Sequence, residues 1–250
     1  MTAMGKVFCI SGIDTDIGKT IVTGLLAKYL VRQGLRTITQ KIVQTGCTGI
    51  SEDILRHRQI MGSGIVDEDR QGLTCPYVFG TPCSPHLAAR LAGQVIDCGL
   101  IGAATDRLRD RYDVVLLEGA GGLHVPLTED VTLLDYIGEK GYPVILVTSP
   151  RLGSINHTVA ALELLHHRGI DLRGLVYNRF PDQDPRITAD SAAVFLRFLA
   201  RFAFPCCLVD LGPFPGATTA CDTTDFSCLF GEKRERDEVV NISTIQGKNA

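Results

Sequence analysis

The segment Gly12-Ile-Asp-Thr-Asp-Ile-Gly-Lys-Thr20 constrains the fold more than any other part of the chain. It follows a short apolar run at residues 6–11 and precedes residues 21–30, whose apolar side chains recur at helical spacing. A strand, a glycine loop and a helix that begins at Gly-Lys-Thr form a cradle for an anion, because the loop amides and the positive end of the helix face it. This order of elements predicts a site for a nucleoside triphosphate.

The loop has an uncommon spacing. Five residues separate Gly12 from Gly18, whereas the usual phosphate loop has four, so Ile13 stands where a first glycine is expected. In such a loop, Lys19 reaches the terminal phosphates and the Thr20 hydroxyl can hold Mg²⁺.

Apolar runs of strand length recur along the rest of the chain, at residues 36–40, 113–118, 143–148, 172–178 and 206–210. Segments with a helical pattern lie between them, at residues 51–61, 84–94, 98–110, 154–168 and 187–202. This alternation predicts a single α/β domain over residues 1–250, a doubly wound and mostly parallel sheet of the P-loop NTPase type with helices on both faces. Residues 62–84 are expected to form a long functional loop, and the tail at about 232–250 to be loosely held.

Ligands of such sheets gather at the carboxyl ends of the strands. Chemically competent residues stand at these positions: Lys41 follows the second run, Glu118 ends the third, residues 149–156 follow the fourth, and Asn178 ends the fifth. We therefore expect these segments to meet in one crevice.

Several of these residues have both a chemical and a structural interpretation. Mg²⁺ prefers oxygen ligands, so Glu118 and Asp53 are candidate metal carboxylates beside Thr20. Glu118 could instead be an exposed strand-end acid, and Asp53 a helix-start acid favoured by the macrodipole. Lys41 and Lys19 could together neutralise a transferring phosphoryl group, or Lys41 could be a solvated charge at the end of its strand.

Two further positions are open in the same way. Ser154 suits the N-cap of a helix whose free amides could also hold a carboxylate. Asn178 could bind an adenine edge, and because Arg179 and Phe180 follow it the Asn-Lys-x-Asp guanine signature is absent.

Composition excludes some classes of partner. The chain has 45% hydrophobic and 21% charged residues, a net charge of −3 and a pI of about 6.1. It therefore lacks the excess of positive charge that is typical of nucleic-acid binding. No apolar run is long enough to cross a bilayer, and no secretory signal is expected from the first residues. The nine cysteines contain no Cys-x-x-Cys pair, so we expect mostly buried thiols in a reducing, cytoplasmic compartment.

Taken together, the motifs resemble those of the dethiobiotin synthetase family, whose phosphate loop shares the five-residue spacing. The resemblance spans residues 6 to about 180 and is carried by the segments 12–20, Lys41-Ile-Val-Gln-Thr-Gly46, Ser84-Pro-His86, Glu118-Gly-Ala-Gly-Gly122, Gly153-Ser-Ile-Asn-His157 and Asn178. Two residues depart from the family pattern: Ile42 stands where proline is usual, and Leu123 where a large aromatic residue is frequent. Neither changes a charged group, so they bear on substrate fit.

The resemblance implies an ATP- and Mg²⁺-dependent ring closure in biotin synthesis. One amine of diaminopelargonic acid takes up CO₂, supplied by bicarbonate, as a carbamate. The carbamate oxygen attacks the γ-phosphate to give a carbamic–phosphoric anhydride and ADP, and the second amine then closes the ureido ring and expels phosphate. The family also implies a homodimer in which the partner's helix start holds the substrate carboxylate.

The resemblance assigns roles to residues of this chain. The implied catalytic residues are Thr15, Lys19 and Lys41. The implied nucleotide-binding residues are Asp16, Ile17, Gly18, Lys19, Thr20, Ile21, Glu118, Gly119 and Asn178. The implied substrate-binding residues are Thr15, Lys41, Thr45, Gly153, Ser154 and Asn156, and the implied metal ligands are Thr20, Asp53 and Glu118.

Other classes share this nucleotide loop. A ParA- or MinD-like dimeric ATPase switch carries a signature lysine five residues before the second loop glycine, and that position here is Ile13. An amide-forming synthetase of the cobyrinate type needs a glutaminase domain, for which the chain is too short. The loop alone leaves a simple kinase open.

Overall fold

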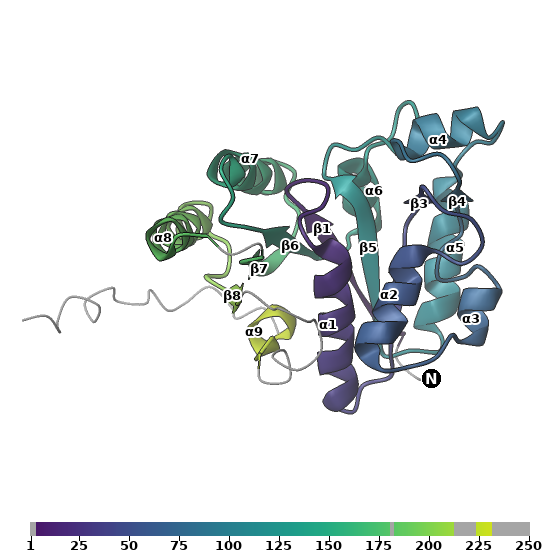
Figure 1. Ribbon diagram of the computed structural model, residues 1–250, viewed down its shortest axis with the longest axis horizontal. Helices are drawn as coiled ribbons and strands as arrows, with labels where there is room; N and C mark the ends of the chain where they lie inside the picture. Colours follow the sequence, from purple (N-terminus) through teal and green to yellow (C-terminus); the bar gives the residue numbers. More distant parts are fainter. Residues whose placement is uncertain (1–3, 181–182, 213–223, 232–250) are drawn as a thin grey trace, which may run out of the picture.

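The computed structural model describes residues 4–180, 183–212 and 224–231. Its centre is a six-stranded sheet in the order β2-β5-β1-β6-β7-β8, and every neighbouring pair is parallel (Figure 1). The predicted parallel, doubly wound architecture is therefore confirmed. The strands are β1 (Lys6–Gly12), β2 (Thr37–Lys41), β5 (Val114–Gly122), β6 (Val144–Thr148), β7 (Leu172–Asn178) and β8 (Leu208–Leu211).

Helices cover both faces of the sheet because its strands are apolar on both sides. On β1, Val7 and Cys9 belong to one buried cluster and Phe8 and Ile10 to the other. The first cluster includes side chains of α5 (Cys98–Arg109), α6 (Leu133–Lys140), α7 (Ser154–His167) and α8 (Pro185–Arg201). The second includes side chains of α1 (Lys19–Arg32), α2 (Glu52–Met61) and α9 (Ser227–Phe230).

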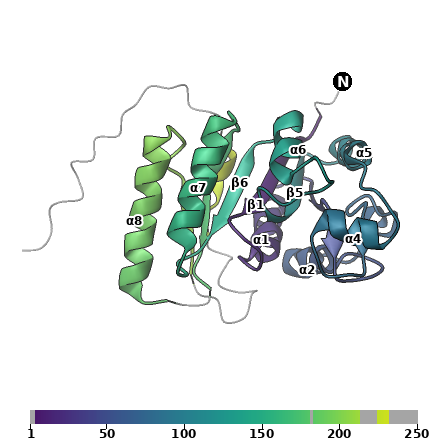
Figure 2. The same ribbon diagram turned by 90° about the horizontal axis from the view of Figure 1, so that it is seen from above.

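Seen from above, α7 and α8 lie together at one end of the molecule and α4 (Pro85–Leu91) lies at the other (Figure 2). The short strands β3 (Gln44–Thr45) and β4 (Val78–Phe79) form a two-stranded parallel sheet, and the chain between them includes α3 (Asp67–Arg70). Strand β3 packs against α4.

The structure corrects several expected bounds. The segment at 62–84 is not one uninterrupted loop, because α3 and β4 form within it. Strand β5 runs four residues past Glu118, and α6 was not predicted. Thr132 caps α6 by accepting from the Asp135 amide at 3.2 Å, while the Asp135 carboxylate accepts from the Thr132 amide at 3.0 Å. The tail at about 232–250 lies outside the described residues.

The cysteines follow the expectation only in part. Cys9 and Cys75 are buried, and burial raises the pKa of each thiol to about 12, so neither is reactive. Cys206 is exposed, and Cys207 and Cys228 form a disulfide, which was not expected from the sequence. This bond joins the segment before β8 to α9. No helix within the described residues is both long and apolar enough to cross a membrane.

Candidate active site

The phosphate loop joins β1 to α1, and two of its glycines are required by close packing. A methyl group on Gly12 would come within 2.6 Å of the Ile17 side chain. Gly18 has a φ of 95°, which side-chain-bearing residues rarely adopt, and a methyl group there would lie 2.3 Å from Asn178 Nδ2. Helix α1 begins at the next residue, Lys19, and no described side chain caps it. The amides of its first turn are thus available for an anion.

Lys19 is held close to this loop. Its side chain is only 7% exposed, and Nζ donates to the Asp14 carbonyl at 2.7 Å. Burial, with the nearby positive charge of Lys41, lowers the pKa of Lys19 to about 8. The Asp14 carboxylate accepts a hydrogen bond from the guanidinium of Arg151, which lies after β6. Two strand ends are therefore linked across the loop.

Two of the residues expected to meet at the sheet edge, Lys41 and Glu118, do meet, and Thr20 and Asp53 join them. Lys41 and Glu118 are register partners at the ends of β2 and β5. Lys41 Nζ lies 2.8 Å from Glu118 Oε1 and 2.7 Å from Asp53 Oδ2, and it also donates to the Gly119 carbonyl at 3.1 Å. Thr20 Oγ1 lies 3.0 Å from Asp53 Oδ1 and 3.0 Å from Glu118 Oε1. Four elements, α1, β2, α2 and β5, thus deliver one compact cluster.

The cluster is strongly coupled electrostatically. Burial by itself would raise the pKa of Glu118, but the Lys41 charge and the hydrogen bond from His57 outweigh it, so this pKa lies well below its usual range. Burial would lower the pKa of Lys41, but Glu118 and Asp53 raise it above its usual value. Glu118 is therefore a carboxylate and Lys41 an ammonium at neutral pH. The alternative of Glu118 as an exposed strand-end acid is wrong, because it is fully buried.

The donor set is suited to a divalent cation. A hydroxyl has one proton, so Thr20 Oγ1 can donate to only one of the two carboxylates, and its other contact brings two oxygens together with no proton between them. A cation would relieve that contact. Two carboxylates and a hydroxyl are the hard oxygen donors that Mg²⁺ prefers, with phosphate and water completing its coordination.

The remaining residues of the phosphate loop have varied surroundings. Asp16 is exposed with a φ of 54°, whereas Ile17 is buried and Ile21 is half-buried, and both pack in the core beside α1. Thr15 is exposed, and its hydroxyl lies 3.7 Å from the point where a methyl group on Gly121 would stand. The loop thus presents Thr15 and Asp16 outward.

Of the remaining predicted residues Gly119, Thr45 and Asn178, Gly119 contacts the cluster through its carbonyl, which accepts from Lys41. Gly119 packs so tightly that an added methyl group would come 2.5 Å from Leu133 Cδ2. Thr45 is half-buried on β3, in register with Phe79. Asn178 Nδ2 donates to the Ile17 carbonyl at 3.0 Å, and its side-chain oxygen accepts from the Phe180 amide at 3.2 Å. Asn178 therefore anchors the phosphate loop, a role that the sequence did not indicate.

The start of α7 differs from expectation at Ser154. The N-cap is Gly153, with a φ of 90°, and Ser154 is the first helical residue. The Ser154 hydroxyl is buried and lies 3.1 Å from the Ser149 hydroxyl, while Asn156 is exposed. Within the described residues, no hydrogen bond joins Gly153, Ser154 or Asn156 to the cluster of Lys41 and Glu118. The Ser154 amide donates to the Arg151 carbonyl at 3.0 Å, so the candidate carboxylate site at this helix start is limited to the amides that follow it.

Sequence reasoning missed three side chains at the site. His57, fully buried on α2, places Nε2 2.7 Å from Glu118 Oε2. Gln44 Oε1 accepts from Ser51 Oγ at 2.7 Å and from the Asp53 amide at 3.3 Å, and so fixes the start of α2. Arg151, which lies within the expected 149–156 segment but was given no role of its own, is the third. The one sequence signal for His57 was its position four residues after Asp53, which places both on the same side of a helix.

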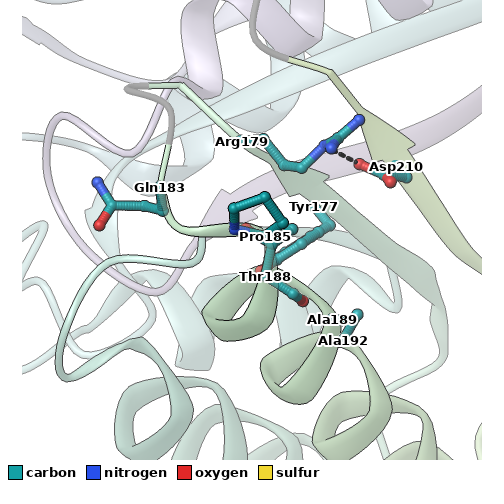
Figure 3. Close-up of a pocket in the computed structure, with 8 residues that line it drawn as sticks. All are labelled: Tyr177, Arg179, Gln183, Pro185, Thr188, Ala189, Ala192 and Asp210. Carbon is teal, nitrogen blue, oxygen red and sulfur yellow. Dashed lines mark hydrogen bonds and ion pairs between the residues drawn. The ribbon is translucent and has the colours of Figure 1, made fainter.

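A separate cavity lies between the end of β7 and α8 (Figure 3). Its volume is about 250 Å³, and Arg179 and Asp210 form an ion pair at 2.7 Å in its wall. None of the predicted site residues lines it. The lining residues are Tyr177, Arg179, Gln183, Pro185, Thr188, Ala189, Ala192 and Asp210.

The parallel sheet and the phosphate loop define a P-loop nucleotide-binding protein, and residues 6–202 match the family described as an AAA domain. ATP-dependent dethiobiotin synthetase BioD 2 of Pasteurella multocida is 52% identical over 200 residues, which cover 80% of this chain and 94% of that relative. ATP-dependent dethiobiotin synthetase BioD of Chlorobaculum tepidum is 53% identical over 200 residues, with coverage of 80% and 84%. The chain belongs to the dethiobiotin synthetase family.

A solved structure shows the fold alone. The structure of pNOB8 ParA bound to nonspecific DNA has a TM-score of 0.53 and 14% identity, and the match covers 87% of this chain and 81% of that chain. Identity this low gives no support to the ATPase-switch alternative.

Proposed function

We propose that the chain catalyses the ATP-dependent closure of the ureido ring of dethiobiotin from 7,8-diaminopelargonic acid and CO₂. The observation that carries the proposal is the convergence of Lys19, Thr20, Lys41, Asp53 and Glu118 at the carboxyl edge of the sheet, in a chain whose relatives are named for this activity. The site holds two ammonium groups and two carboxylates around the end of a phosphate loop.

These residues suit a reaction between anions. The substrate supplies both nucleophiles: a carbamate oxygen attacks the γ-phosphorus as the bond to ADP breaks, and the second amine then attacks the carbamoyl carbon as phosphate leaves. The protein must hold a carbamate anion against a polyphosphate, so its task is to position and to screen charge. Lys19 and Lys41 supply that screening, and the exposed Thr15, with Thr45 on β3, would contact the diamine.

We assign the cation to Thr20, Asp53 and Glu118, because their oxygens already converge. Mg²⁺ bound there would neutralise phosphate charge. In this structure Lys41 pairs with both carboxylates. A cation bound by these carboxylates would balance their charge, and Lys41 would then be free to turn toward the carbamate. The proposal includes adenine beside Asn178, a cytoplasmic location, and a homodimer in which the partner's Gly153–Asn156 segment holds the substrate carboxylate.

Product analysis tests this proposal. We would incubate the purified chain with the diamine, ATP, Mg²⁺ and bicarbonate and analyse the mixture by mass spectrometry. We expect a product that has gained one carbonyl group and lost two hydrogens, together with equal amounts of ADP and phosphate. With ¹⁸O-labelled bicarbonate in a short incubation, one labelled oxygen should appear in the phosphate, because the carbamate oxygen attacks phosphorus.

Two other outcomes would contradict the proposal. A phosphorylated diamine that accumulates without ring closure would indicate a kinase. ATP hydrolysis that is indifferent to the diamine and is stimulated by a protein or by lipid vesicles would indicate an ATPase switch. Omission of the diamine and omission of bicarbonate serve as matched blanks.

A further inference from the structure

His57 lies directly behind the proposed cation site. Its side chain and that of Glu118 are both fully buried, and Nε2 lies 2.7 Å from Glu118 Oε2. The other oxygen, Oε1, faces Lys41 Nζ at 2.8 Å and Thr20 Oγ1 at 3.0 Å. The two oxygens of one carboxylate are thus divided between the protein interior and the site.

The geometry fixes where the imidazole proton lies. Glu118 is a carboxylate and can only accept, so Nε2 must be the donor in this pair. Nδ1 is buried and has no hydrogen-bond partner among the described residues. His57 therefore donates its Nε2–H to Glu118 Oε2, 2.7 Å away.

Helix α2 is well anchored for this purpose. At its start, Gln44 accepts from the Asp53 amide, one helical turn before His57. Near its end, the buried Arg58 donates to both oxygens of Asp69 at 2.9 and 2.8 Å, and to the Thr39 hydroxyl on β2 at 3.0 Å. A helix fixed at both ends holds the imidazole at a fixed distance from β5.

We propose that His57 is a positioning residue for Glu118. Its Nε2–H holds Oε2, so that Oε1 alone is presented to the cation beside Thr20 and Asp53. This inference rests on the proposed role of Glu118 as a cation ligand. A side chain that holds a ligating carboxylate in place typically contributes a factor of 10–100 in metal affinity.

The test measures metal binding rather than turnover. Mn²⁺ is titrated by electron paramagnetic resonance into the full chain with saturating ADP, for the wild type, His57→Leu, His57→Gln and a control on the exposed face of the same helix, Gln59→Leu. We expect His57→Leu to bind Mn²⁺ roughly 10–100-fold more weakly. His57→Gln should recover much of this loss, because its amide nitrogen takes a place comparable to Nε2. Gln59→Leu should match the wild type, and metal-free ADP affinity should be similar in all four.

An Asp53→Asn variant separates this inference from the proposed function. If Asp53→Asn weakens Mn²⁺ binding and His57→Leu does not, the role of His57 is wrong and the cation site stands. If neither variant weakens it, the cation site itself is wrong. Long-range ¹H–¹⁵N NMR of the wild type, which needs no variant to fold, should show a proton on His57 Nε2. A His57 Nε2 without a proton would overturn the inference.

Discussion

Replacing Lys41 tests whether its positive charge stabilises the buried carboxylates of Asp53 and Glu118. In Lys41→Met, the carboxylates of Asp53 and Glu118 lose the ammonium that lies 2.7 and 2.8 Å from them. At an effective dielectric constant of about 20, each of these contacts has a gross attraction of roughly 6 kcal/mol, most of which is offset by the desolvation of the three groups. Loss of one member of a buried ion pair costs roughly 3–5 kcal/mol because it leaves the remaining charge unpaired.

For Lys41→Met, the structure indicates a loss of unfolding free energy at the lower end of this range of ~3–5 kcal/mol, roughly 3 kcal/mol. The Asp53 side chain is 23% exposed and can be partly solvated, and Glu118 keeps its hydrogen bond from His57. We therefore expect urea unfolding in metal-free buffer to show a loss of about 3 kcal/mol, a large share of the ~5–15 kcal/mol typical of a domain. Mg²⁺ with ADP should stabilise the variant more than the wild type, because the cation supplies the missing charge.

Turnover should fall by roughly 10²–10³-fold even where Lys41→Met is folded and saturated, because one preorganised positive group is lost. Arg70→Met is the matched control, since the Arg70–Asp67 pair is exposed and such pairs contribute little. If Lys41→Met were as stable as the wild type without metal, with no extra gain from Mg²⁺ and ADP, Lys41 would not be the counter-charge of Glu118 and Asp53.

Four further outcomes are expected. The pKa of Lys19 is lowered to about 8, so its ammonium is lost as pH rises through 8. Because phosphates favour the charged form, ADP binding should take up protons between about pH 8 and 10.5, which calorimetry in buffers of different ionisation enthalpy would detect. ADP binding without proton uptake in this range would contradict the role of Lys19. The same shift means that the unfolded chain binds more protons in this window, so the Lys19 contribution to the free energy of unfolding should rise with pH there. Gly18→Ala should weaken ADP binding and lower stability by more than the control Gly34→Ala. Gly34 has a similarly positive φ of 82°, but nothing lies within 4 Å of a methyl group added there. Equal losses of stability in thermal unfolding would refute a steric cause at Gly18. Arg58→Met should cost roughly 3–5 kcal/mol in urea unfolding because it leaves buried Asp69 unpaired, and a change too small to measure would refute this role.

Local pattern was sufficient for the sheet and most of its helices. Strands such as 143–148 are covered on both faces, so their continuous aliphatic runs stand out, and the rule that ligands gather at strand ends predicts that Lys41 and Glu118 lie together, as they do. The register between these two residues could not be read from the sequence, because pairing of β2 with β5 joins segments 77 residues apart.

The misses have identifiable causes. Helix α6 is short, and its signal is the capping pair of Thr132 and Asp135 rather than a long periodic run. Gln44 and His57 have their roles because α2 packs against the sheet. This is a tertiary contact, and neither residue type predicts it from the sequence. Ser154 resembles an N-cap in composition, yet Gly153 can adopt the left-handed conformation that starts α7 one residue earlier.

A crystal structure of the chain with Mg²⁺ and a non-hydrolysable ATP analogue would test the central claim most directly. We expect the γ-phosphate to lie within hydrogen-bonding distance of Lys19 Nζ, and the cation to be coordinated by Thr20, Asp53 and Glu118, with Lys41 Nζ displaced from its present position between the two carboxylates. A nucleotide bound away from the loop at 12–20, or a cation outside this group while Lys41 stays paired with Asp53 and Glu118, would contradict the proposed site.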